Sequence, residues 1–241
     1  MITLLSIMIW YTFILAMNNN LLTYNDILSN IADNVPFAWS RWGDGEWACM
    51  LPEAKSLAHI VEVVRQRRSP EDTEIMFEYA KKMKEVLLSE PNYYIGIQNM
   101  SARRFKEDIE PYYSKLEKVC SSEMLHDASI RGDMQDLVDV LRTKRVCLVG
   151  PKYLSNLPFE FTHIVTREDD AWKEEERLIN EVKKIQDSCN VFMYSVSFVS
   201  KILIDTFHNN GNIHLDTGSM WDFYAGRKTR GYMKVLKSKI K

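Results

Sequence analysis

The sequence has no excess of charge of either sign. Among its 241 residues, 31 lysines and arginines face 33 aspartates and glutamates, and the formal net charge at pH 7 is −2. A chain so balanced has no overall attraction for a polyanion, so any anion must be bound by a local cluster of basic residues. We therefore expect no nucleic-acid partner.

Paired cysteines are also missing. The four cysteines lie far apart, and none forms a Cys-x-x-Cys pair or has a histidine at the spacing of a zinc site: Cys49, Cys120, Cys147 and Cys189. We expect four free thiols, a reducing compartment and hence a cytoplasmic location.

Common ligand-binding fingerprints are absent as well. The sequence contains no Gly-x-Gly-x-x-Gly dinucleotide motif, no Gly-x-x-x-x-Gly-Lys-Ser/Thr phosphate loop and no His-Glu-x-x-His zinc motif. Any ligand site must therefore be built from a different pattern.

One apolar run opens the chain. Residues 2–17 carry no charge, and only Ser6 and Thr12 interrupt them. The run is shorter than the roughly twenty residues that span a bilayer, and it lacks the basic stretch and cleavage site of a secretory signal. We assign residues 1–18 to a hydrophobic leader, with membrane association and packing on the domain both open. Residues 19–241 then form one domain.

Along that domain, short apolar runs alternate with helical patterns. This alternation indicates parallel strands joined by helices. We expect an α/β fold, a Rossmann-like and mostly parallel sheet flanked by helices, in a single domain. The expected strands are residues 37–42, 93–98, 124–130, 146–149, 162–166, 191–196 and 212–215, and a helix over 102–119 is expected to break at Pro111.

The most informative stretch is Arg41-Trp42-Gly43-Asp44-Gly45-Glu46, called the 41–46 motif below. Gly43 and Gly45 permit a turn that residues with a β-carbon resist, so Asp44 and Glu46 are expected to project from a strand end. Two carboxylates that converge repel each other unless a cation lies between them, and Mg²⁺ or Mn²⁺ prefers such oxygens. Arg41 could neutralise a carboxylate or hold a phosphate. The alternative is a polar turn in which Asp44 caps the next helix.

Further candidates follow from the expected sheet, because parallel sheets bind ligands beyond the carboxyl ends of their strands. Asp127 is the first choice for accepting a proton, and Asp216 is the second. His126 is an alternative acceptor, and Asp216 could instead cap a turn. The other polar or small residues expected at these ends are Asn99, Arg131, Gly150, Lys152, Ser195, Ser197, Gly218 and Ser219.

The 41–46 motif resembles the Arg-aromatic-Gly-Asp-Gly-Glu signature of the GT-D glycosyltransferases, a family first described as a domain of unknown function. Looser similarity lies at residues 127–131, 149–151 and 215–219, so most of residues 24–226 is covered. The resemblance implies a glycosyltransferase-like catalytic domain with Mn²⁺ or Mg²⁺ at Asp44 and Glu46. It implies a nucleotide-sugar donor, a uridine diphosphate sugar, and a glycan or glycoconjugate hydroxyl as acceptor. With the motif and the expected strand ends taken together, we assign donor binding to Arg41, Gly43, Gly45, Glu46, Asn99, Arg131, Gly150, Lys152, Ser195, Ser197, Gly218 and Ser219. Glu46 could bind the ion or the hydroxyls of ribose or sugar.

Two other functions stay open at this point. In a metal-dependent nucleotide-sugar hydrolase, water would replace the acceptor. In a non-catalytic, membrane-associated interaction domain, Asp44 and Glu46 would only shape a turn. Free sugar released at a rate independent of acceptor would indicate the hydrolase, and a folded protein that binds neither metal nor nucleotide would indicate the interaction domain.

Overall fold

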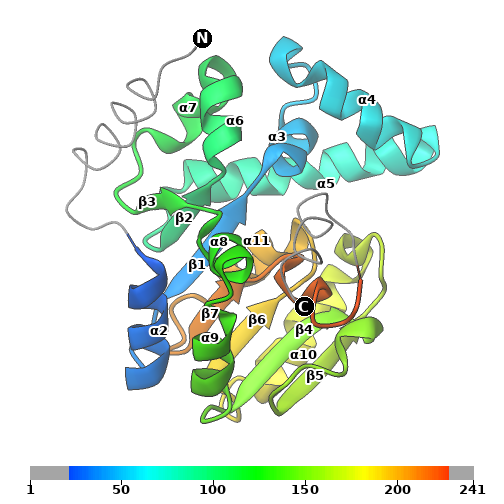
Figure 1. The fold of residues 1–241 in the computed structure, drawn as a ribbon. Coiled ribbons are helices and arrows are strands. Elements are labelled where there is room, and N and C mark those ends of the chain that lie inside the picture. The colour runs from blue at the N-terminus through cyan, green and yellow to red at the C-terminus, as the bar shows by residue number, and fades with distance from the viewer. Residues whose placement is uncertain (1–21, 228–241) are drawn as a thin grey trace.

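A single parallel sheet organises the molecule. The computed structural model describes residues 22–227, with only the backbone at Ile130, so the predicted leader lies outside the described residues. Within them the sheet has seven strands, in the order β3-β2-β1-β7-β6-β4-β5, and every neighbouring pair is parallel (Figure 1). The predicted Rossmann-like α/β fold is confirmed. The strands are β1 (Ala38–Trp42), β2 (Tyr94–Ile97), β3 (Val119–Ser121), β4 (Val146–Pro151), β5 (Phe161–Thr166), β6 (Val191–Tyr194) and β7 (Ile213–Asp216).

Helices cover both faces of the sheet (Figure 1). Side chains alternate along each strand, so in β4 Cys147 and Val149 face one core while Val146 and Leu148 face the other. The first core is closed by α3 (Asp44–Met50), α4 (Ala58–Gln66), α5 (Pro70–Leu88), α6 (Asn99–Arg104), α7 (Lys106–Tyr113), α10 (Glu175–Ile185) and α11 (Val199–Phe207). The second is closed by α2 (Tyr24–Asp33), α8 (Met124–Arg131), α9 (Met134–Leu141) and the short turn η4 (Met220–Asp222).

Two helix starts have the side-chain caps that their sequences predict. Thr23 Oγ1 accepts the amide of Asp26 at 3.2 Å, and Asp26 accepts the Thr23 amide in return. Ser69 caps α5, with Pro70 in the first turn. Such side-chain caps satisfy amides that have no partner inside the helix, and they fix where α2 and α5 begin.

Two predicted elements are wrong. Residues 124–130 belong to helix α8, because Leu125 and Ala128 both pack on the second core at helical spacing. The strand of this region is instead β3, three residues on the edge of the sheet, of which only Cys120 is buried. The helix expected over residues 102–119 breaks at Phe105, between α6 and α7, and not at Pro111. Pro111 is exposed inside α7, and the helix continues through it with one backbone hydrogen bond fewer.

A buried histidine lies in the centre of the sheet. His214 of β7 stacks on Phe192, with 5.1 Å between ring centroids. Its Nδ1 lies 2.9 Å from the hydroxyl of Tyr194, and its Nε2 lies 2.9 Å from Oδ1 of Asn210. The neutral tautomer with hydrogen on Nε2 satisfies both bonds. Burial lowers the pKa of His214 to about 3.

We predict that this histidine makes the fold acid-sensitive. Below pH 6.5 the unfolded chain protonates His214 while the folded chain does not, so stability is lost as the pH falls from 6.5 toward 3. The loss amounts to about 2 kcal/mol between pH 7 and pH 5. Urea unfolding at pH 7 and pH 5 measures this loss: the free energy of unfolding should fall more between the two pH values for the wild type than for His214→Gln. His59→Gln, at an exposed site, is the control. Equal pH dependence in all three proteins would contradict the prediction.

Candidate functional site

The 41–46 motif lies where β1 passes into α3, at the carboxyl end of the sheet. Helix α3 begins at Asp44, with Gly43 as its N-cap. Asp44 and Glu46 therefore occupy the first and third helical positions and do not project from a loop. Since successive helical residues are about 100° apart, the two side chains point to different sides of α3. Asp44 and Glu46 therefore do not converge on one point, and that convergence was the reason for expecting a metal ion between them.

Both carboxylate oxygens of Glu46 have partners in the protein. Oε2 accepts the amide of Gly43 at 3.1 Å, which closes the start of α3, and Oε1 accepts Lys201 Nζ at 2.9 Å. Burial opposes ionisation of the Glu46 carboxyl, but the charge of Lys201 outweighs it and holds the pKa below its usual value. Glu46 is therefore an anion bound on both sides.

Lys201 of α11 joins two carboxylates in the interior. Its side chain is 2% exposed, and Nζ lies 2.9 Å from Glu46 Oε1 and 2.9 Å from Asp216 Oδ2. Burial lowers the pKa of Lys201, but Asp216 and Glu46 together raise it above its usual value. We call Glu46, Lys201 and Asp216 the buried triad. Asp216 Oδ2 also accepts the Ser200 hydroxyl at 2.8 Å and the Arg41 amide at 3.2 Å.

Arg41 is held in one position by two strand ends. Its Nε donates to the carbonyl of Ser122, after β3, at 2.8 Å. On the other side, a β-carbon added to Gly218, after β7, would overlap Arg41 Nη1. Gly218 also has a φ of +50°, which L side chains rarely adopt. Only glycine at this position leaves room for the guanidinium.

A group of acids and amides lies on the β2 and β3 side of Arg41. Glu123, just before α8, is hydrogen-bonded by Asn99; burial and the neighbouring Asp127 raise its pKa, while Asn99 and Arg41 oppose the increase. Burial also raises the pKa of the Asp127 carboxyl, with Arg131 opposing. The structure thus brings Arg41, Asn99 and Asp127 together around Glu123.

Small residues gather at the ends of β4 and β6. The chain leaves β4 toward the edge strand β5 and leaves β6 toward the central strand β7, and open α/β sheets bind ligands where connections diverge in this way. A β-carbon at Gly150 would lie 3.3 Å from Cβ of Ser195. Ser195 Oγ lies 2.9 Å from Thr217 Oγ1. Ser197 has a φ of +54°, a conformation that costs a non-glycine residue free energy.

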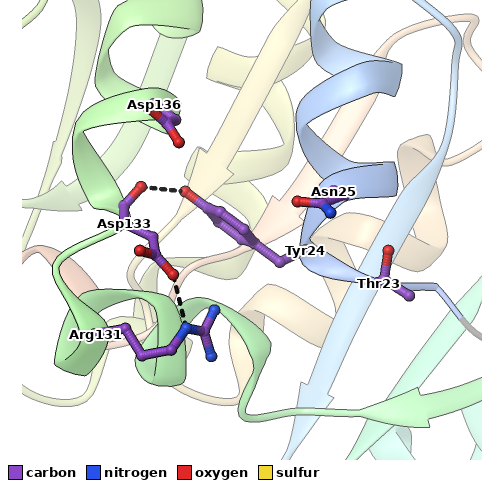
Figure 2. A pocket seen from close by; sticks show the side chains of 6 residues that line it. All are labelled: Thr23, Tyr24, Asn25, Arg131, Asp133 and Asp136. Carbon is purple, nitrogen blue, oxygen red and sulfur yellow. Dashed lines mark hydrogen bonds and ion pairs between the residues drawn. The ribbon is translucent and has the colours of Figure 1, made fainter.

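Three further candidates are Lys152, Ser219 and Arg131. Lys152 is exposed, and Ser219 is the residue that precedes η4. Arg131 forms an ion pair with Asp133, with 2.7 Å between Nε and Oδ2. Figure 2 shows both residues beside Tyr24, whose hydroxyl donates to the Asp133 carbonyl at 2.8 Å. They line a pocket of about 350 Å³ with Thr23, Tyr24, Asn25 and Asp136 (Figure 2).

The comparisons with known proteins give matches in structure only. No family model and no curated protein matches the sequence. A selenomethionine-substituted structure of domain of unknown function 1792 matches with a TM-score of 0.60 and 14% identity, over 85% of this chain and 81% of that chain. A structure of that domain described as a distinct glycosyltransferase fold matches with a TM-score of 0.58 and 15% identity, over the same shares. The chain has a glycosyltransferase fold.

A third structure agrees with this assignment. It is a new glycosyltransferase of the same domain type from Streptococcus sanguinis, with a TM-score of 0.56 and 14% identity, over 87% of this chain and 86% of that chain. The predicted resemblance to GT-D proteins is therefore confirmed for the fold. Within residues 22–227, every helix of this glycosyltransferase fold is too short or too polar to cross a bilayer.

Asp44 and Glu46, the two carboxylates of the predicted metal site, have different partners in this structure. Among residues 22–227, no group of three or more histidines, cysteines, aspartates or glutamates is arranged to hold a metal ion. Glu46 is bound by Lys201 and Gly43. Asp44 is exposed, and its Oδ1 accepts the amide of Gly45 at 2.8 Å. The described residues fit a metal ion at Asp44 alone, with the remaining ligands supplied by water and substrate.

Several residues of the site were missed in the sequence. Gln98 Oε1 accepts the Asp44 amide at 3.2 Å and the Ser101 hydroxyl at 2.8 Å, so it fixes the start of α3. Lys201 had a usable signal, because it falls on the apolar face of its helix beside Ser200 and Ile204. Glu123 could have been identified only by first recognising helix α8, because it lies one helical turn before Asp127 and would then be expected on the same side of the helix.

Proposed function

We propose that the chain is a glycosyltransferase that moves a sugar from a nucleoside diphosphate sugar to a hydroxyl of a glycan or glycoconjugate. The observation that carries the proposal is the fixed guanidinium of Arg41, held between Ser122 and Gly218 at the carboxyl end of a sheet with a glycosyltransferase fold. A uridine diphosphate sugar as donor rests on the resemblance of the 41–46 motif.

Arg41 is the residue we assign to the donor diphosphate. Arginine donates in a planar fork that matches phosphate oxygens. The guanidinium is fixed by the bond from Nε to the Ser122 carbonyl and by the contact of Nη1 with Gly218. Negative charge grows on the diphosphate as it leaves. A guanidinium that is already in position stabilises that charge without reorganisation. The small residues Gly150, Ser195, Ser197 and Gly218 follow or end strands at the same end of the sheet, and we assign the rest of the donor to them.

Asp127 is the residue we assign to the acceptor. It is exposed, so an acceptor hydroxyl can reach it, and its raised pKa makes it a better proton acceptor than an ordinary aspartate. Asp216 was the other candidate for this proton. It is 2% exposed and bound by Lys201, Ser200 and the Arg41 amide, and we assign it to the support of Arg41.

We retain Mn²⁺ or Mg²⁺ as the proposed cofactor, with Asp44 as its protein ligand. Magnesium in phosphate sites is commonly bound by one or two carboxylates, waters and substrate oxygens, which suits a single exposed aspartate. When bound, such an ion acts as a Lewis acid toward the phosphate oxygens.

Calorimetric titration tests this proposal. Uridine, guanosine and cytidine diphosphates are titrated with and without Mn²⁺ into the wild type, Asp44→Asn and the control Asp187→Asn. Asp187 is exposed and follows α10, just before β6, away from the carboxyl ends of the strands. We expect the wild type and the control to bind one diphosphate alike, and Asp44→Asn to lose about tenfold in the presence of Mn²⁺, equivalent to about 1.4 kcal/mol.

Two results would change the assignment. A folded wild type that binds no nucleotide under any metal condition would contradict the transferase and favour the interaction domain. A wild type that releases free sugar from a bound donor at a rate unchanged by acceptor would favour the hydrolase.

A further inference from the structure

We propose that Lys201 is a built-in cation that takes the place of a metal ion between Glu46 and Asp216, so that Glu46 is a positioning residue and not a metal ligand. The proposal deepens the proposed function, and it rests on that function for the role of the 41–46 motif. It concerns the second carboxylate of the Asp-x-Glu pattern, which the motif resemblance assigns to the metal.

The place between the two carboxylates is already filled. Lys201 Nζ is 2.9 Å from an oxygen of Glu46 and 2.9 Å from an oxygen of Asp216, and it is 3.3 Å from Ser200 Oγ. An ammonium group has three N–H donors, so these three acceptors satisfy all of them. The lysine side chain is 2% exposed, which means that these bonds are not replaced by water.

A divalent ion at Glu46 would have to displace one of its present partners. Its ligand oxygens would lie about 2.0–2.2 Å from the ion, which puts the ion against the ammonium group or against the Gly43 amide. Like charges at that separation repel strongly away from bulk water. Asp44 has no such conflict, because it is exposed and bound only by the neighbouring amide of Gly45.

The same lysine also holds the backbone of the 41–46 motif at two points. Through Asp216 it reaches the amide of Arg41, which Asp216 Oδ2 accepts at 3.2 Å. Through Glu46 it reaches the amide of Gly43, which Glu46 Oε2 accepts at 3.1 Å. One cation on α11 therefore sets the backbone on either side of Trp42. Lys201 acts on the donor through Arg41 and Asp44, and it touches neither donor nor acceptor.

Electron paramagnetic resonance of Mn²⁺ tests the proposal, because the signal of the free ion falls when the ion binds. The wild type, Glu46→Gln, Asp44→Asn, Lys201→Met and the control Asp187→Asn are titrated with Mn²⁺, with and without uridine diphosphate. We expect Glu46→Gln to keep the Mn²⁺ affinity of the wild type within about threefold, and Asp44→Asn to lose tenfold or more. Lys201→Met should gain one Mn²⁺ site in the absence of nucleotide, and Mn²⁺ should raise its melting temperature. The double variant Lys201→Met/Glu46→Gln should lack that site.

A wild type that binds Mn²⁺ while folded Glu46→Gln does not would overturn the proposal, as would a folded Lys201→Met that gains no site. Failure of Lys201→Met to fold leaves the decision to Glu46→Gln. A wild type without Mn²⁺ binding in either condition agrees with a lysine in the metal's place, provided that folded Lys201→Met gains the site. Only where Lys201→Met does not fold does Glu46→Gln decide, and it then agrees with the proposal if it binds the nucleotide as the wild type does. Failure of the proposed function is a separate result, since it is the absence of nucleotide binding in calorimetry.

Discussion

Replacing Lys201 with methionine lowers the free energy of unfolding by about 3–5 kcal/mol, the cost of breaking a buried ion pair from one side. The physical reason is that Glu46 and Asp216 remain after the change. Asp216 is 2% exposed and loses its cation where water cannot replace it, whereas Glu46 is 19% exposed and contributes less to the loss. Urea unfolding at pH 7 measures the loss. The side chain of methionine fills a similar volume, so the change isolates charge and hydrogen bonding.

Two further variants separate the buried triad from ordinary surface charge. Lys201→Met/Glu46→Gln/Asp216→Asn removes all three charges, and it should recover a large part of the lost stability, because a buried charge is costly mainly when it is unpaired. Lys81→Met breaks an ion pair with Glu78 in which both side chains are more than 60% exposed, and it should cost less than about 1 kcal/mol. A loss at Lys201 as small as the loss at Lys81 would contradict the burial argument.

Replacing Arg41 with alanine weakens binding of a nucleoside diphosphate by about 10- to 100-fold, since a hydrogen bond to a charged group contributes roughly 1.5–3 kcal/mol. Calorimetry on the folded variant measures this effect. Arg41→Lys should recover little, because a lysine has no Nε to bond the Ser122 carbonyl and no planar fork beyond it. Arg142→Ala, at an exposed arginine paired with Asp139, is the control and should leave binding unchanged.

Gly218→Ala gives an independent view of the same contact. The new methyl group would overlap Arg41 Nη1, and alanine is also strained at a φ of +50°. We expect Gly218→Ala to weaken nucleotide binding, as Arg41→Ala does. Gly226→Ala is a matched control, because its φ is +72° and nothing lies within 4 Å of an added β-carbon. Unchanged nucleotide affinity in both Arg41→Ala and Gly218→Ala would put the nucleotide elsewhere on the molecule.

The fold was largely predictable because its central strands are buried on both faces. A run such as Val146 to Val149 has no position that faces water, so its composition alone identifies it. The errors fall at the edge of the sheet and in short helices. Cys120 is the only buried residue of the edge strand β3, which leaves too little pattern to detect, and α8 was taken for a strand because its apolar positions are few.

The candidate site was predictable in part. Asp44 and Arg41 were expected beside the carboxyl ends of the strands, and they lie there because the motif spans the end of β1 and the start of α3. The partner of Glu46 was not foreseen, since Lys201 is 155 residues away along the chain. Nor could the sequence reveal that α3 begins at Asp44. That start depends on the hydrogen bonds that Gln98 accepts from the Asp44 amide and Glu46 accepts from the Gly43 amide, which exist only in the folded protein.

The position of β7 has a consequence for the order in which the protein is completed. Within residues 22–227, β7 lies between β1 and β6 and joins β3-β2-β1 to β6-β4-β5. During synthesis the ribosome releases both half-sheets before residues 213–216 emerge, so β1 and β6 each present an open edge that other chains can pair with. Asp216 arrives on that same strand, and with it the bond that holds the Arg41 amide. The last of the described strands to appear therefore joins the two half-sheets and brings Asp216 to Arg41 in the same step.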